Sequence, residues 1–111
     1  MTTEQRIIIA SDTAISIRSA ASISEALETC LGSQGLILTE HDLGPEFFDL
    51  HTGIAGELFQ KFINYRVRLA IVLPDPDTYG ERFSELAREH SSHGIVRFLR
   101  SLNEATEWLS E

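Results

Sequence analysis

The chain has 111 residues, of which 42% are hydrophobic and 23% are charged, a composition typical of one folded globular domain. Its formal net charge of −8 excludes the basic surface that proteins need to bind nucleic acid or anionic membranes. The single cysteine, Cys30, excludes an internal disulfide and favours a reducing compartment. No apolar run approaches the roughly 20 residues of a membrane span, and the first residues lack the layout of a signal peptide. We therefore expect one cytoplasmic domain over residues 1–111.

The first third of the chain predicts two short strands and a helix. Residues 6–10 are mostly β-branched, and residues 14–18 alternate isoleucine with polar side chains, so both stretches are typical of strands. Residues 12–13 would form the turn between them and give an N-terminal hairpin or bent edge pair. Ser22 and Glu25 have the spacing of a capping box. Apolar residues at helical spacing follow them, so the sequence predicts a helix that ends at the next glycine.

The middle of the chain predicts a buried strand followed by an amphipathic helix. Residues 35–39 form a continuous apolar run, typical of a strand that is buried on both faces. A polar, glycine-spaced stretch then leads into a helix from about Gly53 to Asn64. Its apolar residues recur at helical spacing and predict one inward face. The inward residues are Ala55, Leu58, Phe59 and Phe62.

The last third predicts two more strands, each followed by a helix. Residues 69–73 are a second continuous apolar run, and residues 95–99 are the last predicted strand. Residues 78–81 and 101–104 each have the spacing of a capping box and mark the starts of the two helices.

Strands alternate with helices after the first hairpin, and the connections are short. This pattern predicts an α/β protein whose later strands are parallel and joined by right-handed crossovers. With the N-terminal hairpin included, we expect a single-domain α/β sandwich. It would have a mixed four- to five-stranded sheet and three to four helices.

The candidate site is the glycine-spaced stretch and the helix that it opens. Thr52 lies just before the predicted first turn, where a hydroxyl commonly accepts from unpaired amides. Gly53 and Gly56 would alternatively let a ligand or partner approach the positive end of the helix dipole. A second interpretation of Gly56 is that it permits close packing of the helix on a strand. The candidate residues for binding a partner or ligand are Asp49, His51, Thr52, Gly53, Gly56, Glu57, Gln60, Tyr65 and Arg66.

A second candidate site consists of acidic and imidazole side chains that follow the predicted strands. Parallel strands bring their carboxyl ends to one edge of a sheet, where ligands bind. Such a cluster would suit a divalent metal or an enzyme's acid–base chemistry. The residues are Asp12, Glu40, His41, Asp42, Asp49 and Asp75. Their spacing matches no metal-binding or catalytic motif, so the sequence predicts no cofactor, no metal and no catalytic residue.

Residues 47–67 carry a signature of aromatic, glycine and basic residues: Phe-Phe-Asp-Leu, Thr-Gly-Ile-Ala-Gly-Glu, Gln-Lys-Phe and Asn-Tyr-Arg-Val. This signature resembles that of short bacterial proteins known only as a domain of unknown function, and the resemblance covers essentially the whole chain. It implies an intracellular bacterial protein with no established activity.

The order of predicted elements also resembles STAS domains, the fold of bacterial anti-sigma factor antagonists. In those proteins a hydroxyl residue before a glycine, at the start of a helix, is phosphorylated by a partner kinase. The resemblance places that role on Thr52, although Leu50 and His51 separate Asp49 from Thr52 and the serine pair of those proteins is absent.

We therefore expect a non-enzymatic regulatory or interaction module that docks a protein partner around Thr52 and the following helix. A homodimer through that helix or through an edge strand is a further expectation, and nucleic acid and membranes are not expected as partners. The alternative is a small-molecule- or metal-binding protein, or a small enzyme, that uses the strand-end carboxylates and histidine.

Overall fold

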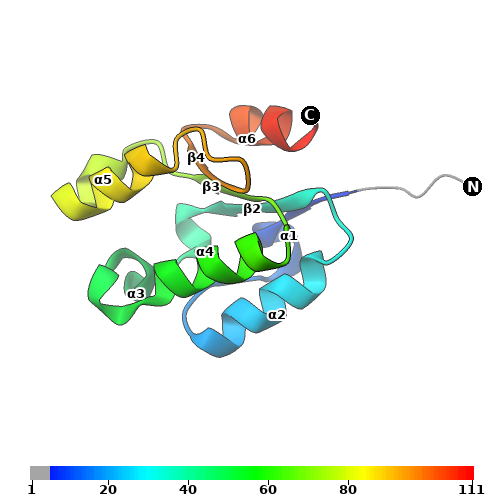
Figure 1. Ribbon diagram of the computed structural model, residues 1–111, viewed down its shortest axis with the longest axis horizontal. Coiled ribbons are helices and arrows are strands. Elements are labelled where there is room, and N and C mark those ends of the chain that lie inside the picture. The colour runs from blue at the N-terminus through cyan, green and yellow to red at the C-terminus, as the bar shows by residue number, and fades with distance from the viewer. Residues whose placement is uncertain (1–5) are drawn as a thin grey trace, which may run out of the picture.

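The computed structural model describes residues 6–111, which fold into one α/β domain around a four-stranded sheet (Figure 1). The strands are β1 (Ile7–Ile9), β2 (Gly35–Thr39), β3 (Leu69–Val72) and β4 (Val96–Leu99). They lie in the order β1-β2-β3-β4, and each pairs in parallel with the next. The α/β class is confirmed. The sheet is parallel throughout, however, so the prediction of a mixed sheet is wrong.

Four longer helices follow or connect these strands. They are α2 (Ala20–Cys30), α4 (Ile54–Asn64), α5 (Glu81–Glu89) and α6 (Leu102–Leu109). Two four-residue helices, α1 (Ala10–Thr13) and α3 (Pro45–Phe48), were not predicted, so three to four helices is too low a count for residues 6–111. Short 3-10 turns lie at η1 (Glu40–Asp42), η2 (Leu50–Thr52) and η3 (Pro76–Tyr79). No helix in this part of the chain combines the length and the apolar content that a membrane crossing requires.

The predicted N-terminal hairpin is wrong. The chain passes from β1 directly into α1, which ends at Ala14 in the left-handed conformation with φ 58°. Residues 15–18 then form an irregular connection in which a single bridge joins Ile17 to Leu43. Ile17 is fully buried. A connection with one side against the core produces the same alternation as a strand, which is why the pattern misled.

Two of the three predicted capping boxes are wrong in detail. The first helix is capped by Ser19, whose hydroxyl accepts from the Ser22 amide at 3.3 Å, and not by Ser22 with Glu25. The predicted box at residues 78–81 does not form, because Thr78 lies in η3 and the N-cap position of α5 is taken by Gly80, which has no side chain to cap with. At the third, the cap by Ser101 is confirmed: its hydroxyl accepts from the backbone amide of Glu104 at 3.2 Å, and it donates to the Glu104 carboxylate at 3.4 Å.

The two faces of the sheet are covered unequally. Three consecutive right-handed crossovers between sequential parallel strands must place their helices on the same face. Accordingly α2, α4 and α5 share one apolar cluster with Leu69 and Ile71 of β3, whereas α6 alone packs against Ala70 and Val72 on the other face (Figure 1). Burial on both faces explains the continuous apolar runs of β2 and β3.

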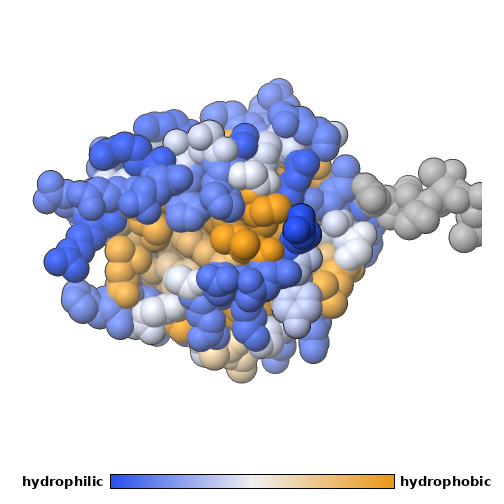
Figure 2. Space-filling view, in the orientation of Figure 1, coloured by the Kyte–Doolittle hydropathy of each residue, from blue (hydrophilic) through white to orange (hydrophobic). Residues whose placement is uncertain are grey.

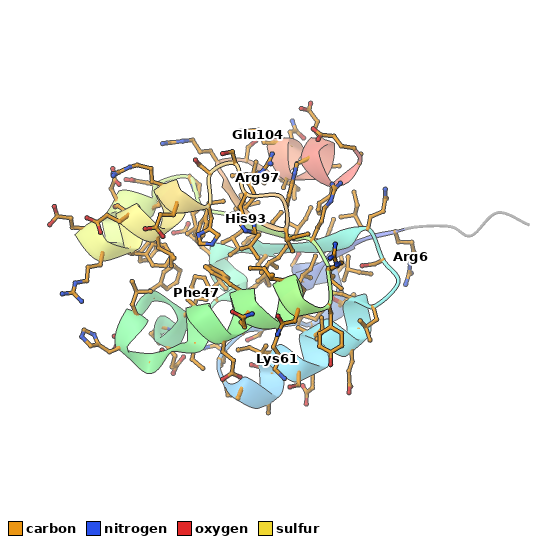
Figure 3. All side chains as sticks on the ribbon, viewed as in Figure 1. Arg6, Phe47, Lys61, His93, Arg97 and Glu104 are labelled. Atoms are coloured by element: carbon orange, nitrogen blue, oxygen red, sulfur yellow. The ribbon has the colours of Figure 1, made fainter. Side chains whose placement is uncertain are left out.

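The face under α6 is completed by arginine side chains on Trp108. The guanidinium of Arg97 lies 4.6 Å from the centroid of the Trp108 ring and that of Arg68 lies 5.4 Å from it. Arg68 also donates a hydrogen bond to the carbonyl of Trp108 at 2.8 Å. Figure 3 shows Arg97 extending from the sheet toward α6. At Gly35 a Cβ atom would lie 2.7 Å from a Leu109 methyl, so this close approach needs glycine.

The four predicted inward residues of α4 are all buried, and Phe62 is fully buried. Phe62→Ala should therefore destabilise the fold by about 3–5 kcal/mol, through lost burial and the cavity left behind. Chemical denaturation measures this change as a shift in midpoint at constant slope. Tyr65→Ala, which truncates a 62% exposed ring just after the same helix, should cost no more than about 0.5 kcal/mol. Equal effects of the two substitutions would contradict this helix phase.

Candidate functional site

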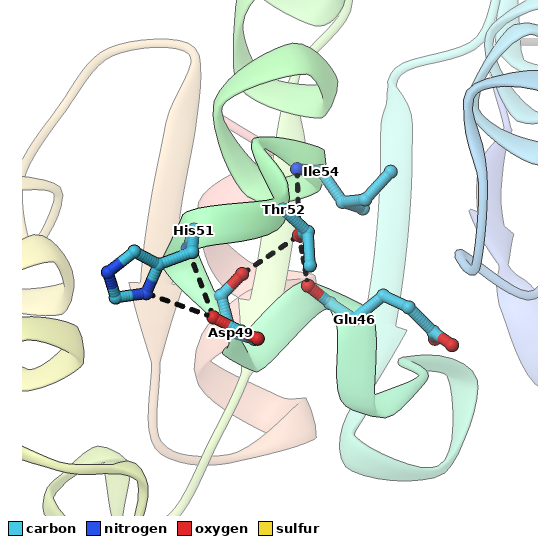
Figure 4. Close-up of polar contacts among 5 residues, drawn as sticks. All are labelled: Glu46, Asp49, His51, Thr52 and Ile54. Carbon is cyan, nitrogen blue, oxygen red and sulfur yellow. Dashed lines mark hydrogen bonds and ion pairs between the residues drawn. The ribbon is translucent and has the colours of Figure 1, made fainter.

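The stretch from α3 to the start of α4, here called the Thr52 turn (residues 46–54), is held by hydrogen bonds of one hydroxyl. The Thr52 Oγ1 atom lies 2.6 Å from the Glu46 carbonyl oxygen and 2.8 Å from that of Asp49, the two acceptors for its proton (Figure 4). The same oxygen accepts from the Ile54 amide at 3.2 Å. Thr52 thus accepts from the first amide of α4, as expected, but the predicted N-cap position belongs to Gly53. The hydroxyl also ties the turn back to α3.

Gly53 is the residue that changes direction between η2 and α4. Its φ of 76° lies in the left-handed region, which favours glycine, and it occupies the N-cap position of α4. Gly56 differs, because a Cβ atom there would meet nothing within 4 Å. Gly56 is exposed on α4, so close packing on a strand does not explain it.

Asp49 and His51 form an exposed pair on this turn. The Asp49 carboxylate accepts from the His51 amide at 3.1 Å and lies 3.3 Å from the Nδ1 atom of its ring. The side chains are 59% and 86% exposed respectively. An exposed ion pair contributes little stability, so both side chains are available on the surface.

The candidate residues of α4 lie in two separate places. Glu57 and Gln60 are exposed on the helix itself, and Gln60 donates to the Asn64 side chain at 2.8 Å. Tyr65 and Arg66 come after the last turn, so eleven helical residues, about 16 Å, separate them from the Thr52 turn. The predicted site is therefore one exposed helix face with the Thr52 turn at one end, and Tyr65 and Arg66 belong to the other end.

Lys61, which the sequence places on the outward face, instead reaches α2. Its Nζ atom donates to the Ser24 hydroxyl at 3.3 Å, and Figure 3 shows the side chain on the α2 side of α4.

The acidic and imidazole side chains at the strand ends do not converge. Within residues 6–111, no three His, Cys, Asp or Glu side chains lie close enough to hold a metal ion. Asp42 is buried and its carboxylate accepts from the amide and the hydroxyl of Thr39 at 2.8 and 2.9 Å, a local capping role. Asp12 and His41 are exposed on separate short elements.

The structure instead pairs Glu40 with Tyr79, a residue that sequence analysis missed. The Tyr79 hydroxyl donates a hydrogen bond to the Glu40 carboxylate, which joins the end of β2 to η3. The Tyr79 ring stacks on Phe48 with centroids 3.8 Å apart and planes 11° apart. No sequence signal indicates this contact, because residues 40 and 79 follow different strands and meet only when the sheet forms.

The thiol of Cys30 is unsuited to nucleophilic chemistry. It is fully buried in α2, and burial raises its pKa to about 11.

The model of a family described as a domain of unknown function, DUF4180, matches residues 2–109. The chain belongs to the DUF4180 family. No curated protein matches the chain, and no solved structure does. The predicted membership of an uncharacterised family is confirmed by the DUF4180 match, whereas the likeness to STAS domains stays a prediction.

Thr52→Ala should destabilise the protein by about 1 kcal/mol, because it removes the acceptor for the Ile54 amide and the tie to α3. Thr52→Ser keeps a hydroxyl in the same position and should recover most of that loss. Denaturant midpoints of the two variants and the wild type measure the difference. If serine and alanine destabilise equally, the hydroxyl does not hold the turn.

The ionisation of Tyr79 reports its contact with Glu40. Its pKa is raised to about 12 by the hydrogen bond to Glu40, with burial and the charges of Glu40 and Asp75 adding to the shift. The folded pKa is higher than the unfolded value of about 10. The stabilising contribution is therefore complete below pH ~10 and disappears as the pH rises toward 12.

Glu40→Gln should bring the pKa of Tyr79 back toward about 10. Phenolate absorbance during an alkaline titration measures it, in a Tyr65→Phe background that leaves Tyr79 as the only tyrosine. Glu25→Gln on α2, away from this contact, is the control. An unchanged titration in Glu40→Gln would show that the hydrogen bond is absent in solution.

Proposed function

We propose that this protein is a non-enzymatic module that docks a protein partner through the Thr52 turn and the exposed face of α4. The observation that supports this is the construction of the turn. Hydrogen bonds within the turn fix its backbone, while Asp49, His51 and Thr52 remain exposed. A rigid, exposed and polar segment of this kind loses little conformational freedom on binding.

The charges on this surface favour a partner with basic groups. Glu46, Asp49 and Glu57 are exposed carboxylates on or next to the turn, and residues 46–54 contain no lysine or arginine. Complementary charge across an interface speeds association and fixes orientation. The net charge of −8 adds a long-range attraction for the same basic partner.

An apolar strip lies beside the proposed docking surface. Figure 2 shows apolar surface between α4 and α3 on one side and α5 and β4 on the other, bordered by polar residues. Half-buried apolar side chains of these elements include Ile54 and Ile63 of α4 and Leu86 of α5. An apolar centre with a polar rim is the usual composition of a protein interface.

Phosphorylation of Thr52, which the likeness to STAS domains suggests, would act on the turn itself. A phosphate at Oγ1 has no proton to donate to the carbonyls of Glu46 and Asp49. It would also add about two negative charges beside two exposed carboxylates. We therefore infer that modification would open the Thr52 turn and change the shape of the docking surface as well as its charge.

The alternative function, ligand or metal chemistry by the strand-end carboxylates, has less support. Asp42 is used in capping Thr39 and Glu40 is paired with Tyr79, so neither carboxylate is left free for a ligand.

Affinity capture from a lysate of the host cell tests the docking proposal. The wild type and Glu57→Lys, which reverses one exposed charge on α4, serve as baits, and bound proteins are quantified by mass spectrometry. We expect a partner bound near stoichiometrically by the wild type to be reduced about tenfold or more with Glu57→Lys, because a like charge now faces its basic groups. Recovery of the protein's own untagged copy would identify that partner as a second subunit.

Glu107→Lys is the matched control, because it makes the same charge change at an exposed position of α6, on the other side of the sheet. This bait should retain the partner. A partner lost equally from both lysine variants, or no partner on the wild type, would contradict docking at this surface.

A further inference from the structure

A hollow that belongs to neither candidate site lies at the carboxyl ends of β3 and β4. A hollow of about 260 Å³ opens there between α5, η3 and the residues that follow the two strands. Ligands of open parallel sheets bind outside the carboxyl ends of the strands. This hollow is formed by different residues from those of the Thr52 turn and of the acidic strand-end set.

Two arginines line the hollow, Arg88 from α5 and Arg100 from the end of β4. Arg100 donates to the Pro74 carbonyl at 3.3 Å. Within residues 6–111 the one carboxylate ion pair is that of Asp49 with His51, so neither arginine is neutralised by an acidic side chain. In a chain with 17 acidic and 9 basic residues, two such guanidinium groups on one hollow indicate a site for an anion.

Three other basic side chains make contacts that stabilise the fold. Arg68 and Arg97 lie on Trp108, and Lys61 donates to α2. Arg88 and Arg100 have no aromatic or carboxylate partner of this kind in the described part of the chain.

The rest of the lining decides which anion fits. Leu73, Ala87 and Phe98 provide an apolar wall, and each is at most 8% exposed. Asp77 also lines the hollow, and its carboxylate accepts from the Ser84 hydroxyl at 2.6 Å. The negative charge of Asp77 offsets part of the field of the two arginines, which disfavours a doubly charged ligand.

We propose that this hollow binds a small organic anion with a single negative charge, a carboxylate attached to a compact apolar group. The carboxylate would lie between Arg88 and Arg100, where charge-assisted hydrogen bonds are available. The apolar group would contact Leu73 and Phe98. The volume of about 260 Å³ lies just below the roughly 300–1,000 Å³ of pockets for drug-sized ligands, so it admits one small molecule.

Benzoate is the probe for this site, because it combines one carboxylate with one compact apolar ring. It is titrated into the ¹⁵N-labelled protein, and amide shifts are followed by NMR. We expect saturable shifts at the amides of Ser84, Arg88 and Arg100. Benzyl alcohol, which has the ring without the charge, and phenyl phosphate, which carries a second charge, should both bind more weakly than benzoate. Equal or tighter binding of benzyl alcohol would overturn anion recognition, and tighter binding of phenyl phosphate would overturn the preference for a single charge.

Arg88→Gln and Arg100→Gln should each weaken benzoate binding by about tenfold, the loss of one charge-assisted hydrogen bond. Arg82→Gln is the matched control, because Arg82 is exposed on the same helix and does not line the hollow. It should bind as the wild type does. The unperturbed part of each NMR spectrum shows whether a variant is folded. Absence of saturable shifts, or equal weakening in all three variants, would refute the site.

Discussion

The parallel pairing of four strands in sequence order is the constraint on which the rest of the structure depends. Right-handed crossovers between such strands place all the connecting helices on the same face of the sheet. Three helices therefore crowd one side, and the eight residues of α6 must cover the other. Trp108 and the two arginines that stack on it extend that cover. Even so, Ile7 and Ile9 of the edge strand β1 remain only partly buried.

The same pairing brings the Thr52 turn, the Glu40–Tyr79 contact and the arginine-lined hollow toward the carboxyl-terminal edge of the sheet. Every connecting segment that leaves a strand begins at this edge, so side chains distant in sequence meet there. The ring of Phe47 packs edge-on against those of Phe59 and Phe83, with centroids 6.2 and 5.8 Å away, and Figure 3 shows Phe47 pointing inward from α3. The polar side chains exposed at this edge are thus supported by closely packed aromatic rings.

The residue types near Thr52 predicted a turn there. The sequence did not show which of the polar residues after the strands would be free to bind a ligand. Thr52 and Gly53 are interpretable alone, because a hydroxyl at a helix start and a left-handed glycine act on their own backbone. Asp42 carries the same local information, yet its capping of Thr39 uses the carboxylate that looked available for a metal. Tyr79 and Arg100 gave no signal, since their contacts are with residues 26 or more positions away.

The sequence by itself determined the α/β class, the four strands to within one residue at each end, and the inward face of α4. Those features follow from apolar periodicity and from interactions within a few residues. Tertiary structure decided the N-terminal region, where Ile17 is buried without a strand, and the parallel direction of β1. It also decided which charges are paired and which line a hollow. The physical reason is that an alternating or polar stretch of sequence sets only its local conformation. The residues that it contacts depend on which elements the folding of the whole chain brings beside it.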